Sequence, residues 1–237
     1  MLQRVLERIA TLHEDPERRP PLVVLDLDGT LYDNRQRTLQ ILFEYAEDVR
    51  AEYADVAECL DTLEVEGIRY LLSTTLKDCG LTHVDVVRDI THWWQERFFS
   101  DEYLAYDVPN DGAPEFVNAC FESGASIVYL TGRDVPGMLL GTVASLRDHG
   151  FPLGVAGVEL VLKPDATLPD EAFKRSALPT LTRVGDVVGF FDNEPANCNI
   201  ARQMFPDADV ALLETQKVPG APESAEGVHH IIDFRLL

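Results

Sequence analysis

The chain has 237 residues, of which 46% are hydrophobic, and its 41 acidic residues outnumber 20 Lys and Arg residues to give a net charge of -21. This length accommodates one large domain or a core with a smaller second unit. The acidic balance argues against nucleic acid and anionic membranes as partners, because both require clustered basic side chains. It also repels anionic substrates, so a phosphorylated substrate would need a local cation or metal ion.

The first segment, Met1 to Arg19, is charged throughout and has no apolar stretch typical of a signal peptide. Its apolar residues recur at helical spacing, which predicts an amphipathic helix packed against the core. We therefore expect a cytoplasmic protein. Reduced thiols are expected as well, because the four cysteines lack the spacing of a metal site or a dense disulfide framework. They are Cys59, Cys79, Cys120 and Cys198.

Residues 22–25 form a short apolar run without alternation, which predicts a parallel strand buried on both faces. Asp26 follows this strand directly, and Asp28 lies two residues further on. Gly29 permits a tight turn whose backbone amides can approach an anion, and Thr30 adds a hydroxyl donor. Because open α/β sheets bind ligands at the carboxyl ends of their strands, both carboxylates are candidates for chemistry.

Residues 34–107 show helical periodicity without a convincing strand. We interpret them as a small helical cap inserted into an α/β core made of residues 1–33 and 108–237. Such an insert can open and close over a site. Within it, His92, Trp93 and Trp94 are candidates to line a substrate pocket, although aromatic residues at helical spacing more often belong to a core.

From residue 108 onward, strands and helices alternate. This pattern predicts a Rossmann-like parallel sheet with helices on both faces. The expected strands cover residues 126–130, 155–162, 187–191 and 210–213, with an edge element at 228–234. The expected helices cover residues 114–123, 135–149, 169–181 and 197–205.

Two later strands also end in polar residues. Thr131, Gly132 and Arg133 follow one of them, and residues 192–194 follow another. An oxygen-rich cluster without His or Cys favours Mg²⁺. In such a site Asp26 can attack phosphorus and form an aspartyl-phosphate, with Asp28 as the acid and base. Alternatively, the two carboxylates hold the metal ion for direct attack by water.

Three segments, DLDGTLYD, LTGRD and FFDNEP, resemble successive motifs of the haloacid dehalogenase superfamily, whose phosphohydrolases carry an inserted cap. The resemblance implies phosphoryl transfer, because the dehalogenases of that family lack the second aspartate, present here as Asp28. It also implies site residues. They are Asp26, Asp28, Thr131 and either Lys174, which we favour, or Lys163 for catalysis; Gly29, Thr30, Gly132 and Arg133 for substrate binding; and Asp26, Asp28, Asp192 and either Glu194 or Asn193 for Mg²⁺.

The predicted function is a Mg²⁺-dependent phosphatase that hydrolyses a small phosphomonoester through an aspartyl-phosphate. A small phosphorylated metabolite is the expected partner, because a cap restricts access. A phosphotransferase or phosphomutase is the nearest alternative. A phosphometabolite-binding or regulatory protein without turnover is a third hypothesis, which the full set of motif residues disfavours.

Overall fold

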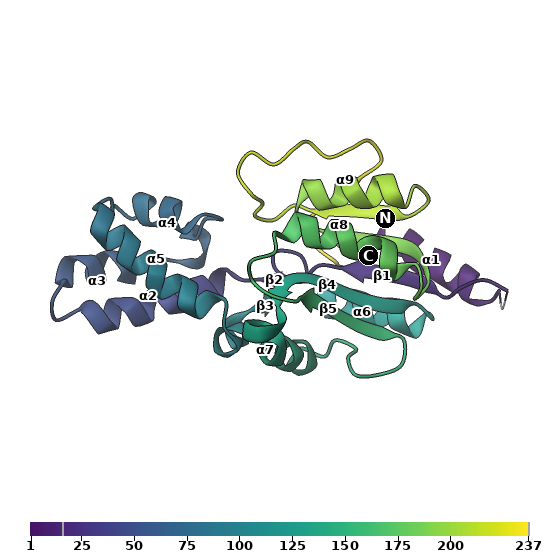
Figure 1. Ribbon diagram of the computed structural model, residues 1–237, viewed down its shortest axis with the longest axis horizontal. Coiled ribbons are helices and arrows are strands. Elements are labelled where there is room, and N and C mark those ends of the chain that lie inside the picture. The colour runs from purple at the N-terminus through teal and green to yellow at the C-terminus, as the bar shows by residue number, and fades with distance from the viewer. Residues whose placement is uncertain (16, 237) are drawn as a thin grey trace.

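The computed structural model describes residues 1–15 and 17–236, which form a six-stranded sheet flanked by helices and a group of helices that extends away from it (Figure 1). All neighbouring strands of this sheet are parallel, so the predicted α/β fold class is confirmed. The strand order is β5-β4-β1-β6-β7-β8. Their bounds are β1 Pro21–Leu25, β4 Ser126–Asp134, β5 Val158–Lys163, β6 Asp186–Asp192, β7 Asp209–Leu213 and β8 His229–Ile231.

Strand β1 lies in the middle of the sheet and is buried along its whole length. Successive side chains of a strand point to opposite faces. Val23 and Leu25 therefore join the apolar cluster under α1, α6 and α7, whereas Leu22 and Val24 join the one under α8 and α9. These helices are α1 Leu2–His13, α6 Ala113–Glu122, α7 Val135–Asp148, α8 Asp170–Leu181 and α9 Pro195–Met204.

The chain leaves the core through β2 (Tyr32–Asp33) and returns through β3 (Val108–Pro109), and these two short strands pair antiparallel. Residues 35–106 between them, called the helical region below, surround an apolar cluster of their own. It forms the left-hand part of Figure 1. Its elements are α2 Arg35–Val49, α3 Ala54–Asp61, η1 Val65–Gly67, α4 Leu72–Asp78, α5 Val84–Phe98 and η2 Asp101–Tyr106.

The structure differs from the sequence expectations in three local features. Strand β4 continues to Asp134 because the residues after Leu130 stay extended beside β5, where Asp134 pairs with Lys163. Helix α3 was not separately predicted. Cys59 and Cys79 form a disulfide between α3 and the end of α4, so the expectation of four reduced thiols was wrong for this pair. Its 20-residue separation gave no sign that the two helix ends meet.

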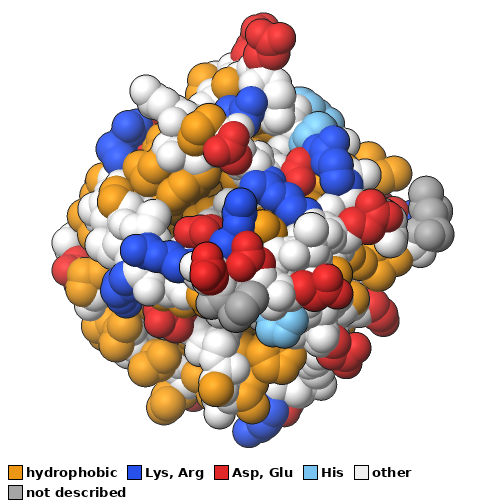
Figure 2. All heavy atoms as spheres, turned by 90° about the vertical axis from the view of Figure 1, so that its right-hand side faces the viewer, with side chains coloured by type: hydrophobic (Ala, Val, Ile, Leu, Met, Phe, Trp, Pro, Cys, Tyr) orange, Lys and Arg blue, Asp and Glu red, His pale blue; other side chains and the backbone are white. Residues whose placement is uncertain are grey.

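The surface of the core carries charged side chains of both signs, although the chain as a whole is acidic. On the face farthest from the helical region, basic and acidic side chains alternate with apolar ones rather than gathering by sign (Figure 2). None of the helices among the described residues is long and apolar enough to cross a membrane. The cytoplasmic location stays a prediction from the sequence.

Candidate active site

Asp26 lies at the carboxyl end of β1 and is 6% exposed. Its backbone N–H donates to the Phe191 carbonyl, 3.0 Å away, which fixes the residue beside the end of β6. The side chain accepts from Lys174 Nζ at 2.7 Å through Oδ1 and from Thr30 Oγ1 at 3.2 Å through Oδ2. Burial raises the pKa of Asp26 to about 7, although the nearby Lys174 ammonium opposes the rise.

Lys174, on helix α8, connects Asp26 with the end of strand β6. Its Nζ also donates to Asp192 Oδ2 at 2.7 Å, and the lysine and Asp192 are both buried. Burial alone would lower the pKa of Lys174, but the attraction of the two carboxylates outweighs it and raises the pKa. We call Asp26, Lys174 and Asp192 the nucleophile cluster, after the role that the sequence predicts for Asp26. It contains two carboxylates and one ammonium group.

The alternative lysine lies elsewhere. Lys163, at the end of β5, donates to Asp170 Oδ1 at 2.7 Å. The structure therefore brings Lys174, rather than Lys163, to the two carboxylates that a third-motif lysine would neutralise.

The residues after Asp192 hold the turn between β6 and α9. Asn193 accepts a hydrogen bond from Thr30 Oγ1 at 3.2 Å, and its amide nitrogen donates to the Gln216 carbonyl at 2.6 Å. Gly29 lies against this amide with φ +79°, and a Cβ there would collide with the Asn193 side chain. This contact requires glycine for both steric and backbone reasons.

The Glu194 carboxylate contacts the loop between β7 and β8. It accepts from Val218 N at 2.9 Å. Asn197, which the sequence analysis did not single out, instead donates to both oxygens of Asp192, at 3.2 and 3.1 Å. Its position five residues after Asp192, on the first turn of α9, was the available signal.

Thr131 is fully buried near the end of β4. Tyr129 pairs with Leu25, so Thr131 lies two residues beyond that pair, next to the start of the motif loop. Its Oγ1 accepts from Arg133 N at 3.2 Å. Gly132 lies against Asp170, where a Cβ would collide with the carboxylate. The geometry places Thr131 and Gly132 at the same sheet edge as Asp26.

Asp28 is bound by two arginines. Arg133 donates to its two oxygens, at 2.8 and 3.0 Å, and Arg37 of helix α2 donates to Oδ1 at 2.6 Å. Asp107, just before β3, accepts from Arg37 at 2.8 and 2.6 Å and from Arg133 at 2.7 Å. Burial alone would raise the pKa of Asp28, but the two guanidinium groups outweigh it and lower the pKa well below its usual range.

We call these four residues the arginine–aspartate ring. Both arginines are fully buried, and so is the Asp107 side chain. Arg133 stays a candidate for substrate binding, and in this structure its guanidinium pairs with the carboxylates of Asp28 and Asp107. Arg37 and Asp107 were not predicted as site residues, because a single Arg on a helix and a single Asp before a strand carry no motif.

The donors around Asp26 fit Mg²⁺. Asp26, Asp192 and the Asn193 amide offer hard oxygen atoms, and Mg²⁺ commonly takes one or two carboxylates together with water and a substrate phosphate. The nucleophile cluster has one carboxylate in excess of its ammonium group, so a bound cation would balance it. Across residues 1–15 and 17–236, His, Cys, Asp and Glu side chains form no group of three poised around one point.

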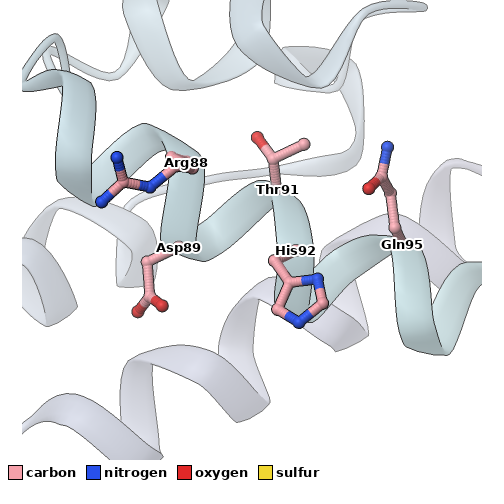
Figure 3. Close-up of a pocket in the computed structure, with 5 residues that line it drawn as sticks. All are labelled: Arg88, Asp89, Thr91, His92 and Gln95. Atoms are coloured by element: carbon pink, nitrogen blue, oxygen red, sulfur yellow. The ribbon is translucent and has the colours of Figure 1, made fainter.

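The aromatic candidates of helix α5 do not face this site. Trp93 packs edge-on against Tyr45, and Trp94 Nε1 donates to Thr38 Oγ1 at 3.1 Å, so both belong to the core of the helical region. His92 lines a shallow hollow of about 490 Å³ on the outer side of α5 (Figure 3). All the residues drawn there come from this one helix, and the hollow has no part in the site at β1.

This protein resembles known proteins in structure rather than in sequence. No protein-family model matches the sequence, and neither does any curated protein. Among solved structures, a protein described as a phosphatase from Clostridium difficile matches with a TM-score of 0.58 at 14% identity, covering 90% of this chain and 94% of its own. A HAD-superfamily hydrolase of subfamily IA from Geobacter sulfurreducens matches with a TM-score of 0.52 at 13% identity, covering 91% and 93%.

Protein tyrosine kinase A of Mycobacterium tuberculosis matches with a TM-score of 0.52 at 16% identity, covering 90% of this chain and 94% of its own. These identities are low, but the matches extend over nearly the whole of each chain. The protein therefore has the fold of the haloacid dehalogenase superfamily, as the three sequence motifs predicted.

Proposed function

We propose that this protein is a Mg²⁺-dependent phosphatase that hydrolyses a small phosphorylated metabolite. The observation that carries the proposal is the nucleophile cluster, in which Lys174 lies 2.7 Å from both Asp26 and Asp192 at the carboxyl edge of the sheet. Proteins described as a phosphatase and as a hydrolase share the fold, which supports this chemistry. A helical region beside the site favours a small substrate over a protein.

In the proposed reaction, a carboxylate oxygen of Asp26 forms a bond to phosphorus while the bond from phosphorus to the ester oxygen breaks. The departing oxygen takes up a proton and leaves as an alcohol. Water then attacks the aspartyl-phosphate at phosphorus, which releases inorganic phosphate and restores Asp26. Lys174 stays protonated throughout and offsets the charge of the carboxylates. Bound Mg²⁺ would stabilise the negative charge on the transferred phosphoryl group.

Asp28 suits one half of this sequence better than the other. Held between two guanidinium groups, its carboxylate favours the ionised form, which can accept a proton from the attacking water. To donate a proton to the departing oxygen, it must first be released from at least one arginine. We therefore propose that Asp28 is the base for hydrolysis of the intermediate and that the departing oxygen takes its proton from solvent.

Two alternatives share this site. Transfer of the phosphoryl group from Asp26 to another hydroxyl would give a phosphotransferase or phosphomutase. Binding without turnover would give a regulatory protein. Phosphate release into water separates the phosphatase from both.

The test is hydrolysis of p-nitrophenyl phosphate with Mg²⁺. We expect phosphate release that stops on addition of chelator and in Asp26→Asn. The matched control is Asp111→Asn, whose carboxylate is 75% exposed, and it should retain the wild-type rate. Full activity of Asp26→Asn would overturn the nucleophile assignment. Tight binding of a phosphorylated metabolite without turnover of any ester in a broad panel would favour the binding protein.

A further inference from the structure

Arg37, on helix α2, connects the helical region to Asp28 of the catalytic motif. It is fully buried, and its guanidinium lies over the Phe98 ring, with Cζ 4.4 Å from the centroid. Nη1 donates to the Phe98 carbonyl at 3.1 Å. Nε and Nη2 donate to the two oxygens of Asp107, at 2.8 and 2.6 Å. The helical region and its return connection thus fix the orientation of this arginine.

The same guanidinium reaches out of the helical region to Asp28, with Nη2 2.6 Å from Oδ1. Asn34, just before α2, adds a long contact to this oxygen at 3.5 Å. Without Arg37, Arg133 would be the remaining arginine on Asp28, and it is shared with Asp107. Because both outgoing and returning connections contribute to the ring, a shift of the helical region would move Arg37 and Asp107 together.

We infer that Arg37 is a positioning residue: the docked helical region sets the orientation of Asp28 through this arginine, so turnover depends on where the region lies. The inference rests on the proposed phosphatase function, in which Asp28 is the base. It goes beyond that function by assigning a role in it to a residue of the helical region. A displacement of about 1 Å in a catalytic group can cost on the order of 10²-fold in rate.

The test compares two arginines on the same helix. Arg37→Met removes the contact to Asp28, and Arg37→Lys keeps the charge but loses the fork. The matched control is Arg35→Met, because Arg35 forms a fork with Asp33 two residues earlier and is partly exposed. We expect Arg37→Met to lower kcat for p-nitrophenyl phosphate by roughly 10- to 100-fold with KM nearly unchanged. Arg37→Lys should recover part of the loss, and Arg35→Met should match the wild type.

A general loss of structure would give a different result. It would lower both Tm and the fraction of active protein, and Arg37→Lys would not recover kcat at the same Tm as Arg37→Met. If Arg37→Met does not fold, the same comparison is made with Arg37→Lys and Asp107→Asn. A folded Arg37 variant with wild-type kcat would overturn the inference.

A second measurement does not need activity. The Trp94 ring stacks on Phe98 at 4.4 Å between centroids, and Phe98 in turn lies under Arg37. Arg37→Met should therefore change the tryptophan fluorescence and speed amide exchange at residues 108 and 110–112, whereas Arg35→Met should leave both unchanged. Unchanged exchange in Arg37→Met would overturn the inference while leaving the phosphatase proposal intact. An inactive wild type that still shows the exchange difference would reject the phosphatase instead.

Discussion

Two buried charge clusters lie at the carboxyl edge of the sheet, and they differ in their balance. The nucleophile cluster has two carboxylates and one ammonium group, and it is built entirely from the α/β core. The arginine–aspartate ring has two carboxylates and two guanidinium groups, and half of it comes from the helical region and its return connection. The charges of the ring offset one another, whereas the nucleophile cluster has one carboxylate in excess and is the proposed site of a cation. We therefore expect the nucleophile cluster to bind the ligand and the ring to fix the orientation of Asp28.

The largest expected effect comes from removing the positive charge of the nucleophile cluster. Lys174→Met removes its one positive charge, so the rate of phosphate release should fall by roughly 10²- to 10³-fold, as when a charge-stabilising donor is lost from an active site. Lys163→Met removes a lysine that pairs with Asp170 instead, and it should stay near the wild-type rate. Steady-state kinetics of both variants decide the assignment. Near-wild-type rates in both would refute a charge-neutralising lysine.

The second effect comes from removing one of the two positive charges of the arginine–aspartate ring. Arg37→Met leaves the buried Asp107 and the partly exposed Asp28 on one arginine, and losing one partner of a buried pair costs about 3–5 kcal/mol. The double variant Arg37→Met/Asp107→Asn removes one charge of each sign, so it should be less destabilised than the sum of the two single variants. Urea denaturation of all four proteins measures this coupling. Strict additivity would show that the ring is not a unit.

The sequence predicted the nucleophile cluster much better than the ring, for a physical reason. Asp26 and Asp192 lie at strand ends within motif patterns, and parallel strands bring their carboxyl ends together. Lys174 lies on a helix, α8, where the resemblance to the family placed the favoured lysine. Arg37 and Asp107 are 70 positions apart and meet only because the helical region folds back on its own exit. The sheet likewise followed from short apolar runs.

The side-chain contacts of the residues that follow Asp192 could not be predicted from the sequence. Glu194 stays a candidate metal ligand from the sequence, and its carboxylate also accepts from Val218 N in a distant loop, a contact that no motif predicted. Asn197 reaches Asp192 only because the helix begins at Pro195 and turns that side chain inward. Side-chain direction within such a turn depends on the loop packed against it, which a single sequence does not specify.

A smaller effect is expected from Mg²⁺, which should stabilise the nucleophile cluster but not the ring. Mg²⁺ should raise the stability of the wild type by about 2.7 kcal/mol at 100 times its Kd, because it binds the folded site and not the unfolded chain. Asp26→Asn should lose most of this gain, whereas Arg37→Met should keep it, since the ring needs no added cation. Thermal unfolding with and without Mg²⁺ measures the shifts. Equal shifts in wild type and Asp26→Asn would place the metal ion elsewhere.

The smallest effect is the pH dependence of the cluster without metal. Burial raises the pKa of Asp26 from 3.8 to about 7, so between these values the folded protein binds more protons than the unfolded chain. Stability must therefore fall as pH rises through this window. Asp26→Asn carries no such charge, so in chelator the Tm of Asp26→Asn relative to the wild type should increase from pH 4 to about pH 7 and then level off. Mg²⁺ should flatten the trend, because it binds the ionised carboxylate; a difference in Tm that does not change with pH would mean that the carboxylate is already balanced without metal.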